Sequence, residues 1–249
     1  MKVAFLVPCL NEERALARVL ADLASFGLPI VVVDDGSTDR TLDIALANHV
    51  RVLSHPERQG KGRALRTGWE ALRAAGYDGL ITLDGDGQHR AEDVAVVLQA
   101  AEQQPRALVV GARLKDRDSQ PALRRAANRL ADWSVSLAAG QPLPDTQSGL
   151  RYYPAAVLNL EGVPADHFVF ETATLVEASR RLGTRITFAP IRARYQPTLR
   201  ASHFRPVRDL LPIVGYVVGA MVRFGVRRRP DEPPPSAPER RAPWAGRGT

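Results

Sequence analysis

The chain has 249 residues, of which 45% are hydrophobic and 24% are charged. This composition excludes a disordered, collagen-like or disulfide-stapled protein, and the length suits one large domain or two small ones. The formal net charge of +7 comes mainly from the C-terminal end, where the last fifty residues hold ten arginines against four acidic residues. Cys9 is the only cysteine, which excludes an intramolecular disulfide and favours a reducing compartment.

The first half of the chain alternates short apolar runs with amphipathic stretches. The apolar runs predict buried strands at Val3–Val7, Ile30–Val33, Val50–Leu53, Gly79–Leu83 and Leu108–Val110. The stretches between them predict helices, marked by the face of Leu16, Val19, Leu20 and Leu23 and by the segments Lys61–Ala75 and Ala91–Gln104. This alternation predicts an α/β fold with a Rossmann-like, mostly parallel sheet and helices on both faces.

The second half is less regular. One helix is indicated by the spacing of Leu123, Ala127, Leu130, Ser134 and Leu137. A loop rich in Gly, Pro and polar residues follows at Gly140–Gly149, then a helix at Glu171–Leu182 and a strand at Ile186–Phe188.

The C-terminal end combines an apolar run with arginines. Leu210–Val222 carries no charge, and as a helix it would reach roughly 20 Å, short of the ~30 Å core of a bilayer. With Arg223 and Arg227–Arg229 behind it, this run predicts an amphipathic helix at a membrane interface. A core helix or an oligomer contact is the alternative. We divide the chain into a domain at 1–208, an interfacial helix at 209–229 and a proline-rich tail at 230–249, for which we expect disorder.

Polar residues follow three of the predicted strands. The clusters are Pro8–Glu13, Asp34–Asp39 and Asp84–His89. Because ligands of open α/β sheets bind beyond the carboxyl ends of the strands, these clusters predict a binding site at one sheet edge.

Asp84 and Asp86 point to the same side if the chain after the fourth strand is extended. Two such carboxylates repel each other unless a cation lies between them, and Gln88 adds a neutral oxygen in the same direction. A hard divalent ion, Mg²⁺ or Mn²⁺, is therefore expected, shared with substrate phosphates. The alternative is an Asp/Gly-rich turn that binds nothing.

Two further motifs narrow the chemistry. The Asp35 carboxylate suits recognition of a nucleotide base or ribose, and Asp39 suits the start of a helix holding Leu42 and Leu46. Gly60-Lys61-Gly62 lacks the remaining residues of a P-loop, and no G-x-G-x-x-G follows the first strand. An ATPase and a dinucleotide oxidoreductase are thus disfavoured. Nucleic-acid binding is not expected either, because no aromatic stacking platform accompanies the tail arginines.

The motifs together resemble a known family. V-P-C-L-N-E-E, V-V-V-D-D-G-S-T-D-R-T, G-K-G-R-A-L-R-T-G and L-D-G-D-G-Q-H, in this order, resemble the family 2 inverting glycosyltransferases of the GT-A fold. Within that family the chain is most similar to the polyprenol-phosphate (dolichol-phosphate) mannosyl- and glucosyltransferases. Looser matches come from Gly111–Arg113, Asp145–Arg151 and Phe168–Glu171.

The resemblance implies roles for individual residues. The nucleotide-sugar pocket would be lined by Pro8, Leu10, Glu12, Val33, Asp35, Lys61, Asp84 and Gly85. Asp84, Asp86 and Gln88 would hold the metal against the donor diphosphate. The catalytic set would be Asp86, Arg113, Arg124 (or Arg125 in its place) and Arg205, with Arg113 and Arg124 facing the acceptor phosphate. Arg200, Ser202 and Arg205 would belong to a basic segment that closes over the diphosphate.

The implied reaction is transfer of a sugar from a nucleotide-sugar donor to a polyprenyl-phosphate lipid at the cytoplasmic face of the membrane, with a membrane-protein partner as an option. A phosphate acceptor is already anionic and needs arginines to position it, not a general base. A hydroxyl acceptor would need a carboxylate base, for which Asp145 and Glu171 are the candidates. An inactive nucleotide-sugar-binding subunit is the other alternative.

Overall fold

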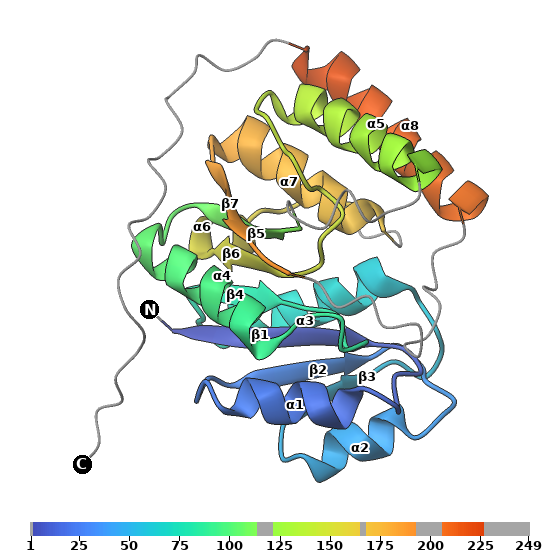
Figure 1. Ribbon diagram of the computed structural model, residues 1–249, viewed down its shortest axis with the longest axis vertical. Coiled ribbons are helices and arrows are strands. Elements are labelled where there is room, and N and C mark those ends of the chain that lie inside the picture. Colours follow the sequence, from blue (N-terminus) through green and yellow to red (C-terminus); the bar gives the residue numbers. More distant parts are fainter. Residues whose placement is uncertain (1, 114–121, 165–167, 193–205, 227–249) are drawn as a thin grey trace.

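The protein is described by a computed structural model covering residues 2–113, 122–164, 168–192 and 206–226 (Figure 1). Seven strands form one sheet: β1 (Val3–Cys9), β2 (Ile30–Asp34), β3 (Arg51–Ser54), β4 (Gly79–Thr82), β5 (Leu108–Ala112), β6 (Arg151–Pro154) and β7 (Ile186–Pro190). The helices are α1 (Leu16–Ala24), α2 (Thr41–Ala47), α3 (Lys61–Ala74), α4 (Ala91–Gln103), α5 (Ala122–Ala139), α6 (Ala155–Leu158), α7 (Val169–Leu182) and α8 (Pro206–Phe224).

The strand order is β3-β2-β1-β4-β6-β5-β7, and every pair is parallel except those that β6 makes with β4 and β5. The chain winds outward from β1 to β3 and then reverses direction at β4. The crevice between the carboxyl ends of β1 and β4 is therefore the topological switch point, where ligands of such sheets bind. The predicted α/β architecture is confirmed.

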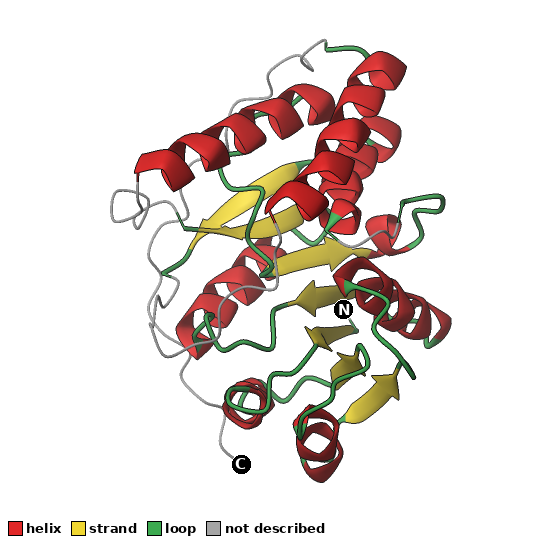
Figure 2. Cartoon of the chain, turned by 90° about the vertical axis from the view of Figure 1, so that its right-hand side faces the viewer, coloured by secondary structure: helices red, strands yellow, loops and turns green. Residues whose placement is uncertain are grey.

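Each face of the sheet has its own core. One core joins inward side chains of β1 and β2 to α3, α5, α7 and α8. The other joins the opposite side chains of the same strands to α1, α2 and α4. Figure 2 shows the resulting layers, with helices on both sides of the strands.

The five strands predicted in the first half are confirmed, as is the strand near residue 186, whereas β6 and the short α6 were not predicted. The helix predicted around Leu130 also exists as α5, but its buried side is not the predicted one. Leu130 is 65% exposed, and Asp132 and Val135 face the core instead. Asp132 can be buried there because its Oδ1 accepts hydrogen bonds from Thr146 N and Oγ1, both at 2.8 Å.

The apolar run near the C-terminus forms α8, which packs against α5 and α7. The predicted boundary at 208/209 falls inside this helix, and the tail at 230–249 lies outside the described residues. Ile213, Val217 and Ala220 face the core, while Val214 and Val218 are about half exposed. Among the described residues, no helix is both long and apolar enough to cross a membrane.

Candidate active site

Lys61, the first residue of α3, lies between two carboxylates from different parts of the chain. Its Nζ is 2.7 Å from Asp84 Oδ1, in the turn after β4, and 3.0 Å from Glu171 Oε2, in the first turn of α7. Burial by itself would lower the pKa of Lys61, but Asp84 and Glu171 outweigh burial and raise it. Burial would likewise raise the pKa of Asp84, and Lys61 reverses that effect and lowers it. Lys61 and Asp84 are therefore both charged at neutral pH.

Among the described residues, Asp86 has no such counter-ion. Burial and the charge of Asp84 raise the pKa of Asp86 to about 6. The hydrogen bond that Gln88 N donates to Asp86 Oδ1, at 3.0 Å, only partly offsets them. The turn after β4 thus carries one compensated and one under-compensated carboxylate, and the second attracts a cation.

The loop before β6 closes against Asp84 and requires glycine at one position. A Cβ atom at Gly149 would lie 2.6 Å from Asp84 Oδ2. Such an atom would displace the carboxylate, so only glycine keeps this oxygen where it is. On the other side of the turn, a Cβ at Gly85 would lie 2.7 Å from Cys9 Sγ at the end of β1.

Asp35 organises the turn that leads into α3. Its carboxylate accepts hydrogen bonds from Gln59 N at 2.9 Å and Gly60 N at 2.7 Å, and it contacts His55 Nδ1 at 2.8 Å. Gly60 adopts φ 102°, a left-handed conformation that favours glycine, immediately before Lys61. Asp35 therefore helps to place Lys61. Contact of the Asp35 carboxylate with a nucleotide base or ribose stays a prediction.

Arg113 and Asp145 form a bidentate ion pair. Arg113 Nε and Nη2 donate to the two Asp145 oxygens at 3.1 and 3.2 Å, and Arg113 N donates as well, at 2.9 Å. Burial tends to raise the pKa of Asp145, but these hydrogen bonds dominate and lower it. Asp145 is consequently a weak base whose position is fixed by Arg113.

Arg151 is a buried cation that the sequence did not identify as part of the site. It is 1% exposed, and its guanidinium donates to three carbonyl oxygens, those of Ser148 (2.7 Å), Thr146 (2.7 Å) and Glu171 (2.8 Å). Its positive charge acts on Asp84 from within the core. The sequence offered one signal: Arg151 is the last residue of the segment Asp145–Arg151 that resembles the family, and two tyrosines follow it.

The polar clusters after β1 and β2 interlock. Asn11 N donates to Ser37 Oγ at 2.8 Å, Thr38 N donates to Asn11 Oδ1 at 2.7 Å, and Glu12 N donates to Thr41 Oγ1 at 2.7 Å. The helix predicted after Asp39 is present as α2, with Asp39 Oδ1 accepting from Thr41 N at 2.9 Å. The structure thus brings these two clusters together at the edge where the turn after β4 lies.

The other predicted residues divide into two groups. Pro8 pairs in register with Val33, and Leu10 follows at the end of β1. Arg125 is half-buried on α5. The side chain of Arg124 and the whole of Arg200, Ser202 and Arg205 lie outside the described residues.

The oxygen donors at this edge suit a hard divalent metal ion. Asp84, Asp86 and Gln88 offer the hard oxygen donors that Mg²⁺ and Mn²⁺ take. The under-compensated charge of Asp86 favours a cation, and the glycine at 149 places no side chain of its own against Asp84 Oδ2. In the described part of the chain, however, no cluster of three or more His, Cys, Asp or Glu could hold a metal. The residues therefore fit a metal that shares its coordination with a bound anion.

Comparison with known proteins identifies the family of the chain. Residues 4–159, more than half of the chain, match the model for "Glycosyl transferase family 2". The chain is 28% identical to a UDP-N-acetylglucosamine–dolichyl-phosphate N-acetylglucosaminyltransferase of Methanococcus voltae, over 64% of this chain and 71% of that protein. It is 29% identical to an undecaprenyl-phosphate mannosyltransferase of Micrococcus luteus, over 77% and 83%.

Among solved structures, glucosyl-3-phosphoglycerate synthase of Mycobacterium tuberculosis, in complex with Mn²⁺, UDP-glucose and phosphoglyceric acid, superposes with a TM-score of 0.64 at 24% identity. The match covers 93% of this chain and 81% of that one. It agrees with the GT-A fold that the motifs predict. The chain belongs to glycosyl transferase family 2.

Proposed function

We propose that the protein transfers a sugar from a nucleoside-diphosphate sugar to a lipid-linked phosphate, with inversion and with the help of Mg²⁺ or Mn²⁺. The observation that carries this proposal is the pair Asp84 and Asp86: Lys61 neutralises the first, and the second has no counter-ion in the part of the chain that the structure describes. A pair of this kind at the switch point of the sheet suits a metal bound together with a diphosphate.

Each charged group has a part in the reaction. When bound, the divalent ion would neutralise the charge that grows on the departing diphosphate. Asp84 and Asp86 would hold it, with Gln88 as a further donor, and Lys61 would add a fixed positive charge beside them. Arg113, held by Asp145, would position the acceptor phosphate.

The state of the candidate bases favours a phosphate acceptor. A hydroxyl acceptor needs a free carboxylate to take its proton, but Asp145 is bound to Arg113 and Glu171 to Lys61. A phosphate is already ionised and needs no base. Two relatives named for dolichyl-phosphate and undecaprenyl-phosphate support the same choice. A soluble acceptor is the second candidate, because the synthase of similar fold was solved with phosphoglyceric acid.

Transfer of radiolabelled sugar tests the proposal. The protein is incubated with Mn²⁺ and a panel of UDP- and GDP-sugars, with polyprenyl phosphate, polyprenol or 3-phosphoglycerate as acceptor. We expect label only in polyprenyl phosphate and at least a hundredfold loss of rate for Asp86→Asn. Asp43→Asn, at an exposed carboxylate of α2, is the matched control and should keep full activity. Label in polyprenol or phosphoglycerate instead would refute the phosphate-lipid acceptor, and full activity of Asp86→Asn would refute the metal site.

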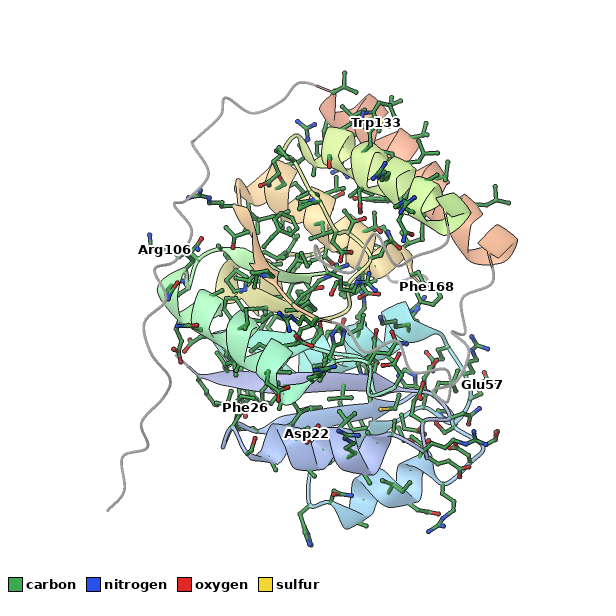
Figure 3. The ribbon with its side chains drawn as sticks, in the orientation of Figure 1. Asp22, Phe26, Glu57, Arg106, Trp133 and Phe168 are labelled. Atoms are coloured by element: carbon green, nitrogen blue, oxygen red, sulfur yellow. The ribbon has the colours of Figure 1, made fainter. Side chains whose placement is uncertain are left out.

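A lipid acceptor requires contact with a membrane, and we propose that α8 and α5 supply it at the cytoplasmic face. The exposed side of α8 presents Leu211, Val214, Val218 and Val222, and α5 adds Leu130 and Trp133. Trp133 lies at the end of the molecule farthest from β3 (Figure 3). Glu177 of α7 holds α8 in this orientation, because Tyr216 Oη donates to it at 3.0 Å and Arg223 pairs with it at 3.3 Å.

Flotation with vesicles tests this surface. The triple variant Val214→Gln/Val218→Gln/Val222→Gln should lose most of its binding to vesicles of anionic phospholipid. The double variant Leu46→Gln/Leu182→Gln, which changes exposed leucines on α2 and α7, should bind as the wild type does. Equal flotation of the triple variant and the wild type would refute membrane contact through α8.

A further inference from the structure

Lys61 occupies a carboxylate oxygen that the proposed metal would also need. Its ammonium is 2.7 Å from Asp84 Oδ1, and its place is fixed by the Asp35 hydrogen bonds to Gln59 and Gly60. The ammonium also has a second carboxylate, Glu171 Oε2, at 3.0 Å. It can therefore release Asp84 without becoming an unpaired buried charge.

We propose that Lys61 is a resident counter-cation that makes metal binding depend on the nucleotide donor. The inference rests on the proposed function, because it takes Asp84 and Asp86 as the metal ligands. Without a nucleotide, an incoming divalent ion must compete with the ammonium for Asp84 and then lie beside it as a like charge. A bound diphosphate gives the ammonium another anion to pair with, and Asp84 becomes available.

Two consequences follow for binding. Metal affinity without nucleotide is low in the wild type because of Lys61, and nucleotide raises it. By thermodynamic linkage, the metal raises nucleotide affinity by the same factor. Part of this coupling comes from direct contact between metal and diphosphate, and the part due to Lys61 disappears when its charge is removed.

Glu171 acts on the metal only through Lys61 in this scheme. Removing the Glu171 carboxylate leaves the ammonium with Asp84 alone, so competition with the metal increases. In a protein that already lacks the Lys61 charge, removing the Glu171 carboxylate should change the metal affinity little. A double-mutant cycle over Lys61 and Glu171 therefore distinguishes counter-cation exchange from a general change of charge.

The test measures Mn²⁺ dissociation constants by the electron paramagnetic resonance signal of free Mn²⁺, with no nucleotide, with UDP and with GDP. Lys61→Gln should bind Mn²⁺ at least fivefold more tightly than the wild type without nucleotide, and its enhancement by nucleotide should fall by a similar factor. Glu171→Gln should bind Mn²⁺ more weakly without nucleotide, by at least twofold, and should have less than a twofold effect in the Lys61→Gln background. Arg63→Gln, an exposed charge on the same turn of α3, should change affinity less than twofold.

The outcomes separate the two proposals. If the wild type binds Mn²⁺ with a nucleotide but Lys61→Gln leaves the affinity without nucleotide unchanged or weaker, counter-cation exchange is wrong while the metal site stands. The same holds if Arg63→Gln reproduces the effect of Lys61→Gln. If the wild type binds no Mn²⁺ under any of the three conditions, the proposed function is itself refuted and the inference falls with it. Circular dichroism of each variant establishes that it is folded, and Glu171→Gln tests the exchange independently should Lys61→Gln not fold.

Discussion

Asp86→Asn should make the protein more stable at neutral and alkaline pH while removing its activity. Burial and Asp84 raise the pKa of Asp86 from 3.8 to about 6, so the folded protein holds this charge at a cost. At about 1.4 kcal/mol per pKa unit, the shift corresponds to roughly 3 kcal/mol of unfolding free energy. Because Asp86 is partly open to solvent, screening reduces the expected gain to about 1–2 kcal/mol.

The sign of the pH dependence follows from proton binding. The folded state holds a proton on Asp86 more tightly than the unfolded chain does, so the cost is absent below the unfolded pKa of 3.8. It grows as the pH rises and is complete above the folded pKa of about 6. The stability gained by Asp86→Asn should therefore be largest at pH 8 and about half as large at pH 5.

Urea unfolding in the presence of a chelator measures this gain at both pH values. Asp84→Asn is the matched control, because Lys61 lowers the pKa of Asp84 and the same substitution there should reduce stability. Two neighbouring carboxylates of one turn would then respond with opposite signs. If Asp86→Asn is no more stable than the wild type at pH 8, or gains equally at pH 5 and pH 8, the charge of Asp86 is not under-compensated.

Two further substitutions probe the frame around this pair. Gly149→Ala places a Cβ 2.6 Å from Asp84 Oδ2, so the affinity for Mn²⁺ in the presence of nucleotide should fall at least tenfold. The electron paramagnetic resonance signal of free Mn²⁺ measures this affinity. The control is Gly215→Ala, where a Cβ meets nothing within 4 Å, and it should leave the affinity unchanged. Arg151→Met removes the hydrogen bonds that the guanidinium donates to three carbonyls and should lower the free energy of unfolding by about 3 kcal/mol in urea titrations. A loss below about 1 kcal/mol would mean that other donors replace the guanidinium.

The sequence predicted the parts of the fold whose residues interact locally. Strand β1 and its neighbours read as apolar runs, and polar residues at their ends indicated the site edge. Strand β6 was not predicted because Arg151 and two tyrosines do not form an apolar run. The strand is buried by its pairing with β4 on one side and β5 on the other. The buried side of α5 was not predicted because it also depends on contacts distant in the sequence: Asp132 is buried with hydrogen bonds from Thr146.

The site shows the same division between local and distant contacts. The pair Asp84 and Asp86 could be predicted because both residues directly follow a buried strand, although the chain there forms a turn and is not extended as predicted. That Lys61 lies between Asp84 and Glu171 could not, because the three belong to a turn and two helices far apart in the sequence. The partners of Asp35 were equally hidden, since its hydrogen bonds reach the turn before α3.

The balance of charge explains why this edge would take a metal and a diphosphate together. Lys61 lies between Asp84 and Glu171, and Arg113 is paired with Asp145, whereas Asp86 has no such partner among the described residues. A donor diphosphate arriving alone would meet the charge of Asp86, and a divalent ion arriving alone would meet Lys61 at Asp84. Together each supplies the opposite charge that the other needs. Arg113 and Arg151 are already held by a carboxylate and by carbonyls, so their charges need no reorganisation during the reaction, whereas Lys61 would exchange Asp84 for the diphosphate when the donor binds.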